Sequence, residues 1–432
     1  MKNSIRFSLF VSILLFASNF LHAQNYKNFG FFGYFRSGFG LDSKGKSMSP
    51  FKAPNAEAKY RLGNEAETYL ETAFVYFMKD NNGASFDTRV LFAIVTPMSQ
   101  SNIYQTTFSL REAYVVGRGL LKAFPETRFW AGQRYYDRYD LHLNDFWYRD
   151  MSGFGGGIEN FKIGGFKAAL AYMGGSLDQL SPSGSMYPTN QFVINKSTVD
   201  LRIYDIKTSV GNLGLTATYS FLNGDSIVTD QGKYTLTDSK GWSLGLFYVI
   251  PFHKEESRNI FNIFYGTGAA ENYRSVMTAP LGVSLKPGDI YDSDEIKRFR
   301  IIDDFLMNVS SKFSIQSVLV YQDLDNGLET KNKYKWFSLG LRPIWHFNKY
   351  FSLAMELGWD YTNQDGGEDG SLFKITLAPQ ITPNNTVMSR PALRLFVTYA
   401  FWSDSFVGEI SPLSFGNQKD GITFGIQAET WW

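Results

Sequence analysis

The chain has 432 residues, a formal net charge of +1 and no cysteine. The near-zero charge gives no argument for binding nucleic acid, and the missing thiols exclude a disulfide framework and thiolate metal sites. Aromatic residues make up 17% of the chain and glycine is frequent, a composition that fits many strands with one apolar and one polar face.

The N-terminal segment 1–23 predicts a secretory signal peptide. Lys2 and Arg6 form a basic start, an apolar run covers Phe7–Phe16, and Ala23 supplies a small residue at a cleavage point. The apolar run is too short for a membrane anchor, and no later segment has the ~18 consecutive apolar residues that a spanning helix needs. An exported chain of this kind is either soluble outside the inner membrane or a barrel in the outer membrane.

Alternation of apolar and polar residues decides between these two classes. In Phe351–Tyr361 every second residue is apolar or aromatic, and Trp242–Ile250 and Leu393–Phe401 repeat the pattern. Each segment runs for about ten residues, the length of a tilted membrane-spanning strand, with aromatics near its ends. At roughly 20–25 residues per strand with its turn, residues 24–432 provide about 16–20 strands. The sequence therefore predicts one all-β, transmembrane antiparallel β-barrel over 24–432.

Polar segments rich in Gly, Asn, Asp, Ser and Pro separate the predicted strands and indicate loops. The longer ones include Leu41–Lys59, Ser176–Lys196 and Thr267–Lys297. Long connections are expected on the extracellular side of such a barrel.

The run Thr127–Gly157, TRFWAGQRYYDRYDLHLNDFWYRDMSGFGGG, combines aromatic rings, arginines and aspartates. Such a density suits neither a soluble core nor a lipid-facing strand. Sugars offer apolar ring faces that stack on aromatics, and hydroxyl edges whose stronger hydrogen bonds are made with charged partners. The run therefore predicts a carbohydrate-binding segment.

The last predicted strand is Gly421–Trp432. Ile422, Phe424 and Trp432 share its outward face, whereas Trp431 shares the other face with polar residues. An aromatic ring in a wet lumen is explained by sugar stacking. The aromatic C-terminal residue resembles the terminal signal of bacterial outer-membrane barrels.

Further short blocks follow one another along the chain. They are GYFRSGFG (Gly33–Gly40), KYRLGNEAETY (Lys59–Tyr69), LREA (Leu110–Ala113), the central run Trp130–Gly153, IEN (Ile158–Asn160), GLRP (Gly340–Pro343), FKITLAPQ (Phe373–Gln380), SRPALRLFVTYAFW (Ser389–Trp402) and the terminal TFGIQAETWW. In this order they resemble the maltoporins, the carbohydrate-selective outer-membrane porins. The resemblance implies a homotrimer of eighteen-stranded antiparallel barrels, each narrowed by an inward-folded constriction loop, here Tyr139–Gly157. It also implies facilitated diffusion of maltose and maltodextrin-type oligosaccharides.

The resemblance further implies an aromatic slide flanked by a polar track. By motif position the substrate-binding slide residues are Tyr34, Tyr69 and Trp431, with Tyr104 next to Ile103, which holds the position of an aromatic contributed by a neighbouring subunit. The polar track is Arg36, Arg61, Arg111, Arg138, Asp140 and Asp145, and Trp147 replaces the constricting tyrosine. Met388 replaces a slide tryptophan. Parity supports these positions: Tyr34 and Arg36 share one strand face, and a second shared face contains Arg61, Glu65, Glu67, Tyr69 and Glu71.

Signals for catalysis are weak. The string Gly241–Gly245 matches G-x-S-x-G but lies inside an alternating strand, without the strand–turn–helix context of a nucleophile elbow. His142, His253 and His346 are widely spaced and fit no metal-ligand pattern. Asp140 and Asp145 could form a glycosidase pair, but neighbouring arginines are expected to keep both ionised. We therefore expect no catalytic residue, metal or cofactor, and expect oligosaccharide and outer-membrane lipid as partners, without nucleic acid.

Three other functions remain open from the residues. The arginines could line a general or differently selective porin on the same scaffold. A hydrolase on an outer-membrane barrel and a secreted lectin are the other two.

Overall fold

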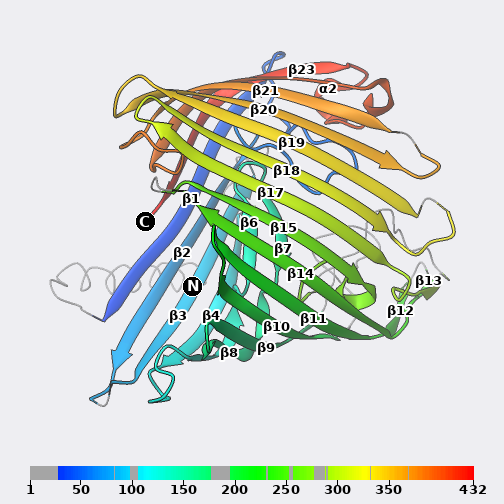
Figure 1. The fold of residues 1–432 in the computed structure, drawn as a ribbon. Helices are drawn as coiled ribbons and strands as arrows, with labels where there is room; N and C mark the ends of the chain where they lie inside the picture. The colour runs from blue at the N-terminus through cyan, green and yellow to red at the C-terminus, as the bar shows by residue number, and fades with distance from the viewer. Residues whose placement is uncertain are drawn as a thin grey trace, which may run out of the picture.

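The computed structural model describes residues 28–81, 83–97, 106–176, 195–229, 232–252, 256–276, 288, 290–330, 332–367 and 369–432. Eighteen strands form one sheet, in which each strand pairs antiparallel with the next. The first and last of these strands also pair with each other, through Tyr34 with Trp431 and Asp42 with Thr423 among others. The sheet therefore closes into a barrel (Figure 1), which confirms the predicted architecture and strand number.

The wall strands, in the order of their pairing, are β1 (Phe29–Asp42), β2 (Glu67–Lys79), β3 (Ser85–Pro97), β4 (Thr107–Arg118), β5 (Arg128–Arg134), β8 (Gly153–Ile163), β9 (Phe166–Ser176), β10 (Asn195–Lys207), β11 (Asn212–Asn223), β14 (Ser239–Pro251), β15 (Arg258–Thr267), β17 (Lys297–Ser310), β18 (Phe313–Asp325), β19 (Lys333–His346), β20 (Phe351–Gln364), β21 (Gly370–Ile381), β22 (Ala392–Trp402) and β23 (Asp420–Trp431). The other elements lie in connections. They are the hairpin of β6 (Arg138–Leu141) and β7 (Phe146–Asp150), a small sheet of β12 (Asp225–Thr229), β13 (Gly232–Leu236) and β16 (Ile290–Tyr291), and the short helices η3 (Gly268–Ala270), η4 (Asp404–Phe406) and α2 (Pro412–Phe415). No helix among the described residues is long and apolar enough to cross a membrane.

The wall strands are apolar outside and polar inside. In β21, Phe373, Ile375 and Leu377 are exposed on the outer face, whereas Lys374 and Thr376 are buried in the lumen. Successive side chains of a strand point to opposite faces, so the period-2 pattern of the sequence produces this arrangement directly. An apolar outer band around a polar interior is the organisation of a barrel in lipid.

Connections differ in length between the two ends of the barrel. At the end where β1 begins and β23 finishes, turns are short, as at 164–165 and 311–312. At the opposite end they are long, as at 43–66, 268–296 and 403–419. Outer-membrane barrels have short periplasmic turns and longer extracellular loops, so we call these the periplasmic end and the extracellular end.

Two connections from the extracellular end fold into the lumen. One is the predicted constriction loop, which contains the β6–β7 hairpin, drawn inside the barrel in Figure 1. The other is the segment 47–66, which we call the inner loop. Its Tyr60 hydroxyl lies 2.7 Å from the Ser338 hydroxyl of β19, and the Leu62 amide donates to Glu356 of β20 at 3.1 Å.

The inner loop differs from its prediction. The sequence predicts a polar extracellular connection over Leu41–Lys59, but β1 continues to Asp42 and the inner loop turns inward. The reason is that Phe51, Tyr60 and several alanines of this segment bury apolar surface, packing in one cluster with the tip of the constriction loop and the wall. Burying apolar area stabilises this placement.

Candidate functional site

A cavity of about 420 Å³ lies in the lumen between three adjacent wall strands, the inner loop and the β6–β7 hairpin. Its lining residues are Tyr34, Arg36, Arg61, Tyr69, Glu71, Arg138, Asp140, His142, Asp145, Trp147 and Trp431. We call it the slide cavity. It contains nine of the residues that the sequence analysis proposed for sugar binding, although they come from segments almost 400 residues apart.

Strand register places the aromatic rings side by side. Tyr34 of β1 pairs with Glu71 of β2 and with Trp431 of β23. Two residues further along β1, Arg36 pairs with Tyr69. Directly paired residues share a face, so all of these side chains point into the lumen. The Tyr34 and Tyr69 ring centroids are 6.1 Å apart, and Tyr69, Tyr34 and Trp431 therefore follow one another across three strands.

Each of several rings carries a guanidinium group on one face. Arg36 lies 5.0 Å from the Tyr69 ring centroid, and Arg390 lies 4.4 Å from that of Trp431. Arg138 lies 3.5 Å from the Trp147 ring centroid. Such cation–π contacts are attractive and fix the orientation of the ring. These contacts therefore hold Tyr69, Trp431 and Trp147 in place in the cavity lining.

Arg61 is held by protein groups rather than left free in the cavity. It donates to Glu65 at 2.6 Å, to the Tyr34 hydroxyl at 2.7 Å and to Glu429 at 3.2 Å. It also lies in the inner loop, because β2 begins only at Glu67. Arg61 and Glu65 are therefore not on a strand, and the prediction that they share a strand face with Tyr69 is wrong, although Arg61 does line the cavity.

Glu429 is the centre of a buried ion-pair cluster that the sequence analysis missed. Its carboxylate lies 2.7 Å from Arg390, 3.1 Å from Arg394 and 3.2 Å from Arg61. His142, at the tip of the hairpin, lies 3.5 Å away. Burial lowers the pKa of His142 well below its ordinary value, so the imidazole is neutral. The only sequence signal for Glu429 was its place on the same strand face as Trp431.

Arg36 and Glu71 on the cavity wall are also partnered. Arg36 pairs with Asp145 at 3.4 Å and also with Glu67. Glu71 accepts hydrogen bonds from the Tyr69 hydroxyl at 2.6 Å and the Tyr135 hydroxyl at 3.0 Å. Glu71 and Tyr135 were not among the predicted site residues, although Glu71 shares the strand face of Tyr69.

The two aspartates of the hairpin have pKa values shifted in opposite directions. Burial raises the pKa of Asp140 above its ordinary value against the opposing charge of Arg61. Burial also acts to raise the pKa of Asp145, but Arg61 and Arg36 outweigh it and the pKa is lowered. The lowered pKa of Asp145 agrees with the expectation that arginines keep it ionised, whereas at Asp140 burial acts against the neighbouring arginines.

Two other predicted positions, Arg111 and Met388, are not part of this cavity. Arg111 sits where the β3–β4 register shifts, and its exposed side chain is not part of the cavity lining. Met388 is partly buried against an apolar cluster that includes Val387 and Ile344, and it is not part of the slide-cavity lining. Tyr104 lies outside the described residues. Within the described ranges, no three His, Cys, Asp or Glu side chains are grouped to hold a metal ion.

Two further buried clusters attach the loops to the wall. Arg149 of β7 pairs with Asp137 at 2.5 Å and with Asp200 of β10, and all three side chains are fully buried. In the inner loop, Glu57 pairs with Arg300 at 2.9 Å and with Arg298, both on β17. These contacts hold the constriction loop and the inner loop in the lumen.

The ion pairs of Glu57 with Arg298 and Arg300 should persist in mildly acidic solution. Burial acts to raise the pKa of Glu57, but Arg298 and Arg300 lower it from 4.5 to about 2. A lowered folded-state pKa means that the stabilisation is complete above pH 4.5 and is lost as the pH falls toward 2. We expect single-channel conductance to stay constant from pH 7 to pH 4, and Glu57→Gln to raise it at pH 7 by loosening the inner loop. A conductance that already rises near pH 5 in the unaltered protein would contradict this.

Comparison with known proteins places these features in a family. A family model described as LamB porin matches residues 29–432. Among solved structures, OpdK of Pseudomonas aeruginosa, an outer membrane protein, is 11% identical with a TM-score of 0.48, covering 94% of this chain and 100% of that one. OmpF of Salmonella typhi, in complex with daunomycin, is 12% identical with a TM-score of 0.47, covering 93% and 98%. The in-vitro folded OmpT of Vibrio cholerae, in a trimer form, is 9% identical with a TM-score of 0.40, covering 94% and 99%.

The family match includes every residue of the slide cavity and all eighteen wall strands. It confirms the resemblance to maltoporins that the sequence blocks indicated. LamB porins are channels and not enzymes, which supports the non-enzymatic interpretation of Asp140 and Asp145. The chain therefore belongs to the LamB porin family and is an outer-membrane porin.

Proposed function

We propose that this porin conducts neutral oligosaccharides of the maltose and maltodextrin type by facilitated diffusion through the slide cavity. The observation that carries the proposal is the succession of Tyr69, Tyr34 and Trp431 on three adjacent strands, with charged hydrogen-bonding groups beside the rings. A sugar would stack on the rings while its hydroxyls exchange partners along Arg36, Arg138 and the carboxylates.

The charge of the cavity favours a neutral solute. Its lining has three arginines, Arg36, Arg61 and Arg138, and three acidic residues, Glu71, Asp140 and Asp145. Neither sign dominates, so there is no net field to attract an anionic or a cationic solute. A mixture of donors and acceptors instead matches hydroxyl groups, which both donate and accept hydrogen bonds.

The individual contacts are weak, and conduction depends on that weakness. An aromatic contact contributes about 1 kcal/mol beyond area burial, and a typical hydrogen bond has a similar net value. Solutes pass when each site is favourable enough to enter and shallow enough to leave. Three rings in a row supply such a series of equivalent sites.

The test is block of ion current by sugar in a planar bilayer containing the purified protein. We expect maltose and maltotriose to reduce the current. Tyr34→Ala and Trp431→Ala should each weaken sugar affinity about fivefold, and together about thirtyfold, because each removes about 1 kcal/mol of stacking. Ion conductance without sugar should change little.

Tyr34→Phe is the matched control, since it keeps the ring and removes only the hydroxyl that contacts Arg61. It should retain most of the affinity that Tyr34→Ala loses. If maltose, maltotriose and other oligosaccharides all fail to reduce the current, selective sugar binding is wrong and a general porin remains.

A second candidate is a porin of the same scaffold with a different sugar preference. Met388 favours it, because it stands where the resemblance implies a slide tryptophan and is not part of the slide-cavity lining, and a shorter row of rings contacts fewer sugar units. The same bilayer measurement with a panel of neutral saccharides separates the two candidates: a stronger block by a sugar unrelated to maltose would replace the maltodextrin assignment.

The proposed function also requires that the protein is exported, processed and assembled in the outer membrane. We propose export with cleavage of the signal peptide 1–23, insertion of 24–432 in outer-membrane lipid, and a homotrimer in which Tyr104 reaches the slide of a neighbouring subunit. The family membership and the apolar outer face support this arrangement. Crosslinking of the purified protein into trimers and N-terminal sequencing of the mature chain are the checks.

A further inference from the structure

The β6–β7 hairpin has a second face that the slide does not use. Neighbouring residues of a strand point to opposite sides, and the hairpin follows this rule. Arg138, Asp140 and Trp147 line the slide cavity, whereas Tyr139 and Tyr148 line a different cavity of about 390 Å³ on the other side of the hairpin. We call this the rear cavity; its volume is within the range of small-molecule sites.

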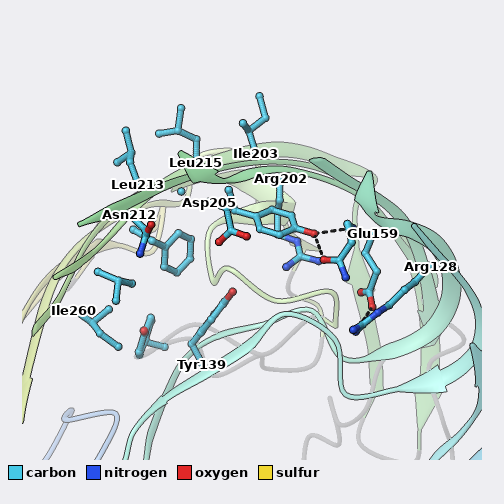
Figure 2. A pocket seen from close by; sticks show the side chains of 16 residues that line it. Arg128, Tyr139, Glu159, Arg202, Ile203, Asp205, Asn212, Leu213, Leu215 and Ile260 are labelled. Carbon is cyan, nitrogen blue, oxygen red and sulfur yellow. Dashed lines mark hydrogen bonds and ion pairs between the residues drawn. The ribbon is translucent and has the colours of Figure 1, made fainter. Parts of the chain in front are cut away.

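The rear cavity combines rings with charged groups, as the slide cavity does. Tyr139 lies 5.0 Å from the Phe247 ring centroid and is 37% exposed. On the wall strands, Arg202 and Tyr204 face it, and Arg128 and Glu159 form an ion pair of 3.7 Å at its edge. Figure 2 shows Tyr139 pointing from the hairpin toward the strand that carries Arg202 and Asp205, whereas Ile203, Leu213 and Leu215 point away on the outer side of the wall.

The rear cavity is closed toward the extracellular end. The next inward-facing residues in that direction, Asp200, Thr216 and Asn262, are 0%, 4% and 0% exposed. The fully buried Arg149 of the hairpin bonds to Asp200 and Thr216, and Asn262 donates to the hydroxyl of Tyr148 at 3.4 Å. The described part of these strands therefore leaves no passage along this side of the hairpin. A solute can reach the rear cavity only from the periplasmic end, so the cavity binds solutes and does not conduct them.

We propose that the rear cavity is a second saccharide site, open to the periplasm. The choice of ligand class rests on the proposed function, because the chemistry that would recognise a sugar in the slide is repeated here: a partly exposed ring beside ionic hydrogen-bonding partners. Sugar that leaves the slide cavity is released at the same end of the barrel. The rear site therefore holds transported sugar close to the periplasmic end without narrowing the conduction path through the slide cavity.

Gly214 provides a way to fill this cavity without touching the slide. It lines the rear cavity on β11, and a Cβ atom added there would lie 3.7 Å from its nearest neighbours, an ordinary contact distance. Gly214→Phe should therefore occupy the cavity with little strain, and Gly214→Ala is the matched control that leaves it open. Ile260→Phe, on β15, is a second filling variant that uses a different wall position.

The experiment is equilibrium dialysis of the purified porin with radiolabelled maltose. We expect two equivalents per chain for the unaltered protein and one for the slide variant Tyr34→Ala/Trp431→Ala. Adding Gly214→Phe or Ile260→Phe to the slide variant should remove the remaining equivalent, whereas adding Gly214→Ala should keep it. In the bilayer, Gly214→Phe alone should leave sugar block of the current unchanged.

The outcomes separate this inference from the proposed function. If the unaltered protein binds one equivalent and the slide variant binds none, the rear site does not exist and the slide proposal stands. If the slide variant keeps one equivalent that neither filling variant removes, the rear cavity is not the second site. If the unaltered protein binds no maltose and its current is not blocked, both proposals fail.

Discussion

Replacing Glu429 with alanine is expected to lower the free energy of unfolding by about 3–5 kcal/mol. The Glu429 carboxylate is 3% exposed and is paired with Arg61, Arg390 and Arg394. Its removal leaves three guanidinium groups close together in the lumen without their common counterion, and breaking a buried ion pair on one side has a cost of this size. The measurement is urea unfolding of the purified protein in detergent, followed by tryptophan fluorescence.

Glu67→Ala is the matched control for Glu429→Ala. Glu67 also pairs with an arginine of the slide cavity, Arg36, but its side chain is 32% exposed. Solvent screens such a pair, so the loss should stay below about 1 kcal/mol. Equal losses for the two variants would mean that the Glu429 cluster does not anchor the inner loop and the hairpin tip to the wall.

Replacing Arg149 with methionine should increase single-channel conductance several-fold and weaken sugar block. Arg149 of the hairpin pairs with Asp200 of β10 and with Asp137 of the same loop, and Asp137 in turn pairs with Arg202 of β10 at 2.6 Å; the side chains of both aspartates are fully buried. Without the guanidinium group, these two carboxylates face each other beside Arg202 alone, a state that favours separation of the hairpin from the wall. Because the hairpin narrows the lumen, its release widens the path. Conductance in a planar bilayer and block by maltose are the measurements.

The double variant Arg149→Met/Asp200→Asn distinguishes an electrostatic effect from a loss of packing. Removing both charges of a buried pair is less harmful than removing one, so the double variant should have a conductance closer to that of the unaltered protein. If the double variant conducts as strongly as Arg149→Met, the hairpin is held by packing and hydrogen bonds rather than by this ion pair.

Strand periodicity predicted the features that depend on neighbouring residues. The barrel class and the inward direction of Tyr34 and Trp431 follow from which residues alternate within one strand, and the structure has the same faces. The assignment of Arg138, Asp140 and Asp145 to one place came instead from the resemblance to a family. The local sequence shows only that charged and aromatic residues are frequent between Thr127 and Gly157.

Features that join distant segments could not be predicted in this way. The Glu429 cluster combines the inner loop, the hairpin tip and the last two strands, and no local pattern relates Arg61 to Arg390. The inner loop looked like an ordinary polar connection because its apolar residues have no strand or helix period. The rear cavity is lined by the hairpin and by residues of β10, β11, β14 and β15. It therefore forms only when these distant segments come together in the folded barrel.

The seam between β1 and β23 has a consequence for biogenesis. The wall is incomplete until its final twelve residues arrive, yet the inner loop near the beginning of the chain depends on partners far downstream: Tyr60 on Ser338, Leu62 on Lys374 and Arg61 on Glu429. Contacts of such large sequence separation form slowly, and unsheltered apolar segments aggregate in the meantime. The constricted part of the lumen therefore cannot form stepwise as the polypeptide emerges. It forms only when the first and last wall strands pair and the barrel closes.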